Sequence, residues 1–185
     1  MDNPMRKTVL TFGLISGAIL SVMMAVTIPF HDSIGWDKGE VIGYTTMVAA
    51  FLLVFFGIRS YRDNVAGGTV SFGRAFKVGA LIALVASACY VATWEVIYFN
   101  FAPDFMEKYQ AHMIDEARAK GESQAQIDKK LADGEKFAKM YQNPAINAAI
   151  TFIEPLPIGL LFALVSAGIL SRRRRTEGAV EVMAT

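Results

Sequence analysis

Four stretches of the chain carry no charged side chain and consist mainly of apolar residues, which constrains the fold more than any other feature. They cover residues 8–30, 41–58, 78–94 and 155–171, and they are 23, 18, 17 and 17 residues long. A helix that crosses a bilayer needs about 20 mainly apolar residues, with a range of about 17–25. A buried helix of a soluble protein would show a polar stripe on one face, and no such stripe is visible. The pattern therefore predicts four membrane-spanning helices.

The composition agrees with a membrane domain. Apolar residues make up 54% of the 185 residues and charged residues 19%, against about 45–50% and 25% in soluble proteins. The run 8–30 is longer than the apolar region of about 7–15 residues in a cleaved signal peptide, so we expect it to remain as the first span. Cys89 is the only cysteine, which excludes an internal disulfide.

The predicted fold is an all-α membrane protein with four transmembrane helices and an additional amphipathic helical hairpin on the outer side, between the third and fourth spans. We expect residues 1–185 to form one four-span domain. Its expected parts are spans at about 8–30, 41–58, 76–99 and 145–171, a hairpin insertion at 100–144 and a basic tail at 172–185.

The basic residues predict the orientation of the spans. With the N-terminus inside, the cytoplasmic segments hold ten Lys and Arg residues against four acids, whereas residues 31–40 and 100–144 hold eight against eleven. Because an excess of Lys and Arg marks the cytoplasmic side, both termini are expected inside and the hairpin outside. The four arginines at 172–175 follow the last span directly, so we interpret them as an anchor rather than a site for nucleic acid or anionic lipid.

Short polar motifs predict where helices begin. Asp37 and Glu40 have the spacing of an N-cap and an N3 carboxylate, which would explain Glu40 without a functional role. Ser71 is placed to cap the third span, and Asn143, which precedes a proline, is placed to cap the fourth.

The polar segment 100–144 has helical periodicity. Gly121 and a capping box formed by Ser123 and Gln126 divide it into two helices. Its apolar stripes favour a lid that packs on the spans. The alternative interpretation is a surface that docks an envelope protein.

Small residues recur at four-residue spacing in three of the spans. In lipid, helices approach closely where side chains are small. The small residues therefore predict contact faces, either within one chain or between copies in a homo-oligomer: Gly13, Gly17, Gly79, Ala83, Gly159 and Ala163.

Glu40, Glu95 and Glu154 are predicted to lie at one membrane depth. Each is 18 or 19 residues along its helix from a basic residue at the cytoplasmic end, or roughly 27 Å at about 1.5 Å per residue. Carboxylates inside a membrane are costly and mark functional sites by default. We expect the carboxyl groups of Glu95 and Glu154 to lie within about 8 Å of each other, near enough to interact at low dielectric constant. The alternative for Glu95 is an interfacial residue in contact with water.

Two prolines follow Glu154 and predict a break in the fourth span. Pro155 removes the hydrogen bond to the carbonyl of Thr151, and Pro157 removes the bond to the carbonyl of Ile153. The freed carbonyls would complete a proton or cation site beside the glutamate, as broken helices do in transporters. The alternative is a structural kink whose carbonyls are satisfied by water or a hydroxyl.

No arrangement typical of an enzyme is evident. His31 and His112 are the only histidines, and no Ser/His/Asp or Cys/His set is recognisable. His31, Asp32 and Asp37 do not have the spacing of a standard set of metal ligands. We therefore expect no catalytic activity, no cofactor and no metal.

A resemblance to a known family rests on two runs, in this order: YRDNVAGGTVSFGRAFKVG at 61–79 and DGEKFAKMYQNPAINAAITFIEPLPIGLLFALVSAGIL at 133–170. The chain resembles the uncharacterised bacterial inner-membrane family labelled domain of unknown function 4199 (DUF4199). The resemblance covers nearly the whole chain, and the loop run and the E-x-L-P-x-G element at 154–159 are its most specific parts. It implies a four-span protein of the bacterial inner membrane, and it implies no activity.

The sequence leaves two functions open. The first is proton- or cation-linked transport of a small solute, or an accessory role in it, with Glu95 and Glu154 as binding residues. The second is a non-catalytic scaffold that binds an envelope partner through the hairpin. A water-accessible cavity that reaches Glu154 favours transport, whereas a filled interior favours the scaffold.

Overall fold

The computed structural model describes residues 4–171, and all regular secondary structure in this part of the chain is helical. In chain order the helices are α1 (Pro4–Thr27), the 3-10 turn η1 (Ile28–Phe30), α2 (His31–Ile34), α3 (Trp36–Asn64), α4 (Phe72–Asn100), α5 (Phe105–Ala119), α6 (Gln124–Tyr141), α7 (Pro144–Phe152) and α8 (Pro155–Leu170).

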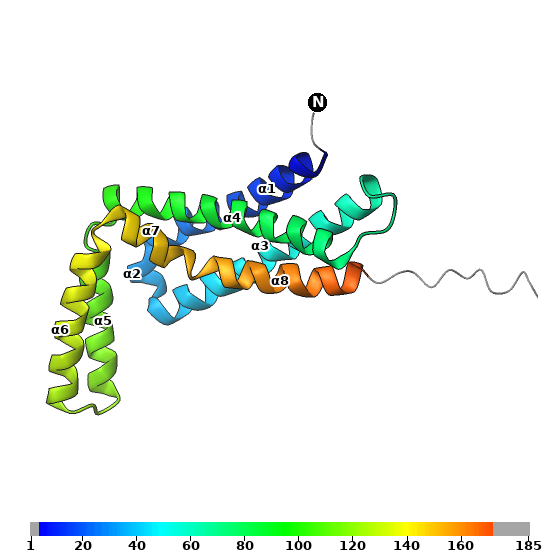
Figure 1. Ribbon diagram of the computed structural model, residues 1–185. Coiled ribbons are helices and arrows are strands. Elements are labelled where there is room, and N and C mark those ends of the chain that lie inside the picture. The colour runs from blue at the N-terminus through cyan, green and yellow to red at the C-terminus, as the bar shows by residue number, and fades with distance from the viewer. Residues whose placement is uncertain (1–3, 172–185) are drawn as a thin grey trace, which may run out of the picture.

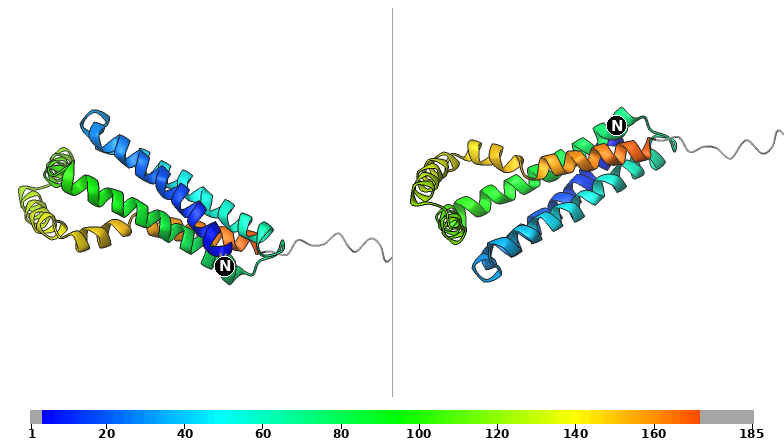
Figure 2. Two further views of the ribbon diagram at one scale, coloured as in Figure 1. Left: turned by 90° about the horizontal axis from the view of Figure 1, so that it is seen from above. Right: turned by 90° about the horizontal axis from the view of Figure 1, so that it is seen from below.

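The long helices α1, α3, α4 and α8 pack beside one another, and α7 extends the line of α8 (Figure 1). Helices α5 and α6 form a hairpin at one end of this assembly. We call this end the hairpin end. The first residues of α1, the loop between α3 and α4 and the last residues of α8 lie at the opposite end. Figure 2 shows that α1 and α3 diverge from α4 and α7 towards the hairpin end.

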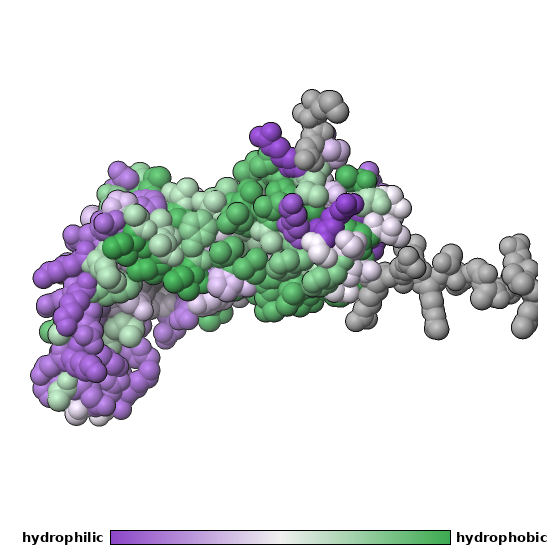
Figure 3. Space-filling view, viewed as in Figure 1, coloured by the Kyte–Doolittle hydropathy of each residue, from purple (hydrophilic) through white to green (hydrophobic). Residues whose placement is uncertain are grey.

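Four helical segments are long and apolar enough to cross a bilayer, namely Pro4–Phe30, Trp36–Asn64, Phe72–Asn100 and Pro144–Leu170. This confirms the expectation of four apolar spans. In their most apolar windows only 22–44% of the residues are buried inside the protein. The remaining apolar side chains form a continuous surface over the long helices, whereas the hairpin surface is polar (Figure 3). An apolar surface of this extent agrees with contact to lipid.

One core joins the long helices. Phe51, Val54 and Ile58 of α3 are fully buried, and so are Val78 and Ile82 of α4. Side chains of α1 and α8 belong to the same core. Because protein interiors are close-packed, the end of the molecule opposite to the hairpin is filled.

Glycines allow the closest helix contacts. A Cβ atom on Gly79 would lie 2.7 Å from Cδ1 of Ile58 and 2.9 Å from Cβ of Ala163, and a Cβ atom on Gly159 would lie 2.7 Å from Cβ of Ala83. Real Cβ atoms essentially never approach other atoms so closely. These small residues therefore form contacts between helices of one chain. Such contacts are one of the two alternatives that the spacing suggested, the other being contacts between copies in a homo-oligomer.

Glycines of helix α1 likewise allow a close contact with α4. A Cβ atom on Gly13 would lie 2.7 Å from Cβ of Val85, and a Cβ atom on Gly17 would lie 2.6 Å from Cβ of Cys89. Ser16 is fully buried, and its hydroxyl donates to the carbonyl of Ala50 at 2.8 Å. One face of α1 therefore contacts both α3 and α4.

The structure corrects one predicted helix start. Helix α3 begins at Trp36 after Gly35, which has φ 83°, and no side chain caps it. The prediction that Asp37 and Glu40 form a capping box is wrong, because the left-handed conformation of Gly35 starts the helix earlier. Glu40 therefore lacks the local explanation that the sequence offered.

The other predicted starts are found where expected. Asn143 caps α7, with its side chain accepting from the backbone N–H of Ala145 at 3.0 Å. Ser71 is the N-cap residue of α4, although its side chain makes no capping hydrogen bond. Ser123 and Gln126 form the capping box of α6.

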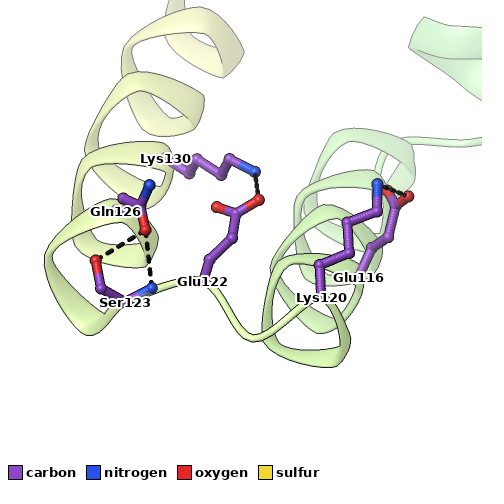
Figure 4. Close-up of polar contacts among 6 residues, drawn as sticks. All are labelled: Glu116, Lys120, Glu122, Ser123, Gln126 and Lys130. Atoms are coloured by element: carbon purple, nitrogen blue, oxygen red, sulfur yellow. Dashed lines mark hydrogen bonds and ion pairs between the residues drawn. The ribbon is translucent and has the colours of Figure 1, made fainter.

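The hairpin tip is held by its own contacts. Figure 4 shows the capping box together with two ion pairs, Lys130 to Glu122 at 2.6 Å and Lys120 to Glu116 at 2.5 Å. Ile114, Ala117 and Ile127 form a small buried cluster between the two helices. The tip thus packs on itself rather than on the spans.

Candidate functional site

A cavity of about 730 Å³ lies at the hairpin end, where the long helices diverge. Residues of α1, α3, α4, α5, α6 and α7 line it, so both the hairpin and the spans contribute to its walls. Among the predicted site residues it includes Thr151, Ile153 and Glu154. Cavities of a few hundred Å³ or more are the usual size of small-molecule sites.

Glu154 stands at the wall of this cavity. Its Oε2 atom accepts a hydrogen bond of 2.8 Å from the hydroxyl of Tyr90. Glu40 lines the same cavity from α3 and lies within electrostatic range of Glu154. Neither carboxylate forms an ion pair with a basic residue in the range 4–171. The structure therefore brings two glutamates of the predicted layer to one site, but they are Glu40 and Glu154.

Glu95 lies elsewhere. It is not among the residues that line the cavity, and only desolvation, without a charged neighbour, acts on its carboxyl group. Tyr90 and Trp94 are four residues apart and share one face of α4, whereas Glu95 is turned by about 100° from Trp94. The structure thus does not join Glu95 and Glu154 as expected. Within the described chain, one oxygen of Glu95 (Oε1) is buried without a hydrogen-bond partner.

The break predicted at the two prolines separates α7 from α8. Helix α7 ends at Phe152, residues 153 and 154 form a turn, and Pro155 begins α8. The carbonyl of Thr151 is not free, because the chain tightens and the N–H of Glu154 donates to it at 3.4 Å. Ile153 is 69% exposed and lines the cavity. The break places Glu154 between two helix segments instead of within one.

A buried chain of hydrogen bonds links the hairpin to the spans next to the cavity. The indole N–H of Trp94 donates to the hydroxyl of Tyr141 at 2.9 Å, and that hydroxyl lies 3.0 Å from Oγ1 of Thr151. The Thr151 hydroxyl also donates to Oδ1 of Asn147 at 3.2 Å. Asn147 is fully buried, and its amide donates to the carbonyl of Tyr141 at 3.2 Å. Burial raises the pKa of the Tyr141 phenol, which keeps this hydroxyl neutral.

Aromatic rings close the seam between the hairpin and the spans. The ring of Trp36 stacks on His112, with centroids 5.4 Å apart and planes at 14°. Phe105 packs edge-on against Trp94 at 4.8 Å, and Tyr141 packs edge-on against Tyr98 at 5.3 Å. These contacts hold the base of the hairpin over the cavity.

The charges around the cavity are almost all negative. Its acidic lining residues are Asp37, Glu40, Glu116 and Glu154, and the lining contains no Lys or Arg. Lys120 pairs with Glu116, and His112 lies 4.0 Å from Asp37. The two carboxylates that remain without such a partner are Glu40 and Glu154.

The rest of the lining is aromatic and sulfur-rich. Five of the nine methionines of the chain line the cavity. The aromatic lining residues are Trp36, Tyr44, Tyr90, Trp94, Phe105, Tyr109, Phe137 and Tyr141. Such walls bind apolar groups and adapt to their shape.

Sequence reasoning missed Tyr90, Tyr141 and Asn147. Tyr90 precedes Trp94 by four residues, which places two amphipathic rings on one helix face. Asn147 is an amide inside an apolar run and precedes Thr151 by four residues, and that spacing is a signal that could have been used. No sequence signal shows that the hydroxyl of Tyr90 meets a carboxylate 64 residues away.

No group of three His, Cys, Asp or Glu residues that could hold a metal ion occurs among the described residues. The side chains of His31 and Asp32 and the arginines at 172–175 lie outside the described part.

Comparison with known proteins gives one match. A family model with the description "Protein of unknown function (DUF4199)" matches residues 11–172, which is most of the chain. No curated protein and no solved structure matches it.

Proposed function

The chain belongs to the DUF4199 family of proteins of unknown function, and from that starting point we propose that it takes part in proton- or cation-linked transport across the bacterial inner membrane, with Glu154 as the binding group. In this proposal the hairpin lies on the outer side and both termini lie in the cytoplasm. The protein binds and moves its cation without catalysing a reaction.

One observation carries the proposal. Glu154, a carboxylate without a basic partner among residues 4–171, interrupts a segment long and apolar enough to span the membrane, and it lines a cavity of about 730 Å³ together with Glu40. An intramembrane carboxylate of this kind is expensive to keep unless it serves a function. The hydroxyl of Tyr90 holds the carboxylate in place at 2.8 Å. Transporters place their binding groups at such broken helices.

The hairpin supports transport more than the alternative scaffold role. Its large apolar side chains near the base, Phe105 and Tyr141, pack against the spans. The face of the hairpin seen in Figure 3 is mostly polar, and the large apolar side chains exposed on the hairpin are Tyr109, Leu131 and Met140. An interface that binds a protein partner usually exposes aromatic residues at its centre, so we assign the hairpin the role of a lid.

Glu154→Gln tests the proposal in purified protein reconstituted into lipid vesicles. The vesicles contain a pH-sensitive dye, and a membrane potential drives protons inward. We expect the wild type to pass protons faster than protein-free vesicles, and Glu154→Gln to lower this rate at least about tenfold because the path loses its titratable group. Repeating the assay with a Na⁺ gradient tests a metal cation in place of the proton.

Two further variants complete the test. Glu107→Gln removes an exposed carboxylate of the hairpin that does not line the cavity, and it should keep the wild-type rate. Glu95→Gln tests whether Glu95 also belongs to the site, as the sequence suggested. If Glu95→Gln lowered the proton flux as much as Glu154→Gln, Glu95 would be part of the site. Wild-type rates equal to those of protein-free vesicles with both cations would overturn the proposal.

The proposed orientation gives a separate prediction. In a Cys89→Ala background, a cysteine at Ser123 should react with a membrane-impermeant maleimide added to intact cells. A cysteine at Ser60, near the end of α3, should react only after the cells are lysed, because an excess of basic residues marks the cytoplasmic side. Labelling of Ser60 alone in intact cells would reverse the orientation.

A further inference from the structure

We propose that the cavity at the hairpin end takes an amphipathic organic cation, that is, an ammonium or phosphonium centre attached to an apolar body. This inference rests on the proposed function in one respect, the identification of the cavity around Glu154 as the functional site. It adds the chemical class of the solute.

The sign of the charge follows from the lining. Glu40 of α3 and Glu154, at the break between α7 and α8, line one cavity, and neither has a basic partner in the described chain. No Lys or Arg lines the cavity. Since two carboxylates in a partly dehydrated space repel each other, a bound cation between them would relieve this repulsion, and an anion would add to it.

Two tyrosine rings favour an organic cation over a metal ion. Tyr90 is held beside the binding group, because its hydroxyl donates to Glu154. Tyr44 lies on the α3 wall and is 45% exposed. In the part of the chain that the structure describes, neither ring stacks on another aromatic ring, and the half-buried Tyr90 also packs against the apolar core. Aromatic rings attract ammonium and phosphonium centres, whereas metal ions such as Ca²⁺ and Mg²⁺ are bound by oxygen ligands and gain little from aromatic rings.

The remaining wall suits an apolar body. Met23 and Met24 of α1, Met47 of α3 and Met106 and Met113 of α5 all line the cavity. Methionine side chains are flexible and polarizable, so a wall built of them accepts apolar groups of different shapes. A strongly hydrated, purely polar cation would leave this wall without a partner. The combination of two carboxylates with an adaptable apolar wall therefore selects an amphipathic cation.

The two tryptophans of the chain provide the measurement. Trp36 and Trp94 are the only tryptophans, and both line the cavity, so tryptophan emission reports directly on its occupant. The probe is tetraphenylphosphonium, and the matched control is tetraphenylborate, which has the same shape and the opposite charge. Both are titrated into the purified full-length protein in lipid nanodiscs, with empty nanodiscs to correct for partition into lipid.

We expect tetraphenylphosphonium to change the emission saturably and tetraphenylborate to give no saturable change. Glu154→Gln and Glu40→Gln should each raise the Kd for tetraphenylphosphonium about tenfold, which corresponds to about 1.4 kcal/mol. Glu107→Gln, outside the cavity, should change it by less than about twofold. Both replacements at the cavity keep the size of the side chain, and an unchanged melting temperature shows that the fold is intact.

Three results would overturn the inference. They are equal saturable binding of both probes, an unchanged Kd in both cavity variants, and the absence of saturable binding in the wild type. The vesicle assay contains no organic cation, so its outcome is independent. Proton flux that depends on Glu154 without binding of tetraphenylphosphonium would reject only the solute class, and binding without flux would reject only proton-linked transport.

Discussion

Replacing Gly159 by alanine should destabilise the protein by about 1–3 kcal/mol, the usual cost of overpacking a well-filled interior. The new Cβ atom would lie 2.7 Å from Cβ of Ala83 and 2.8 Å from Cε1 of Phe51. Phe51 is fully buried and cannot move aside without disturbing the core. For a protein of this size, the loss corresponds to a fall of about 2–12 °C in Tm, measured by thermal unfolding in detergent.

Gly168→Ala is the matched control, because Gly168 lies on the same helix and a Cβ atom there would meet nothing within 4 Å. Alanine has a higher helix propensity than glycine by up to about 1 kcal/mol. Gly168→Ala should therefore leave Tm unchanged or raise it slightly. Equal effects at the two positions would mean that Gly159 is not a site of close helix contact.

Removal of the hairpin should have a larger effect. We expect replacement of residues 104–142 by a short Gly/Ser bridge to lower Tm by about 10 °C or more. The deletion removes the ring contacts of His112 with Trp36 and of Phe105 with Trp94, and it leaves the amide of Asn147 without the carbonyl of Tyr141. Loss of one large buried aromatic side chain alone typically costs about 3–5 kcal/mol.

A shorter deletion serves as the control for the hairpin. Replacing only residues 118–125 with a Gly/Ser bridge removes the polar tip and keeps the seam with the spans, including Phe105 and Tyr141. Because the tip packs on itself, Tm should fall by less than about 3 °C, since a loop replacement at an exposed tip is well tolerated. If both deletions gave the same Tm as the wild type, the lid role would be wrong and docking of a partner would become the better interpretation.

The sequence predicted the helices well, because their signals are local. Four charge-free runs predicted four apolar spans, and Pro155 predicted the break between α7 and α8. The capping motifs at Ser123 and Asn143 were also found. Asp37 and Glu40 failed as a cap because the conformation of one residue, Gly35, decides where α3 begins. Such a conformation depends on the path of the chain rather than on the motif itself.

The candidate site was only partly predictable. Counting residues along each helix gives the depth of a side chain, so Glu40, Glu95 and Glu154 could be assigned to one layer. Rotation about the helix axis decides which of them meet, and weakly amphipathic membrane helices carry little signal about it. The pair seen at the cavity is therefore Glu40 and Glu154, and its hydrogen-bond donor, Tyr90, comes from a third helix.

The filled end of the molecule separates the cavity from the opposite end of the long helices. Between Glu154 and the loop joining α3 to α4 lies a core in which Phe51, Val54 and Ile58 are fully buried. The glycine contacts at Gly79 and Gly159 clamp α3, α4 and α8 along this stretch. Packed cores of this kind switch between discrete arrangements instead of deforming gradually. If the protein transports a solute as proposed, release on the far side of this core would require a second conformation in which the glycine contacts are separated.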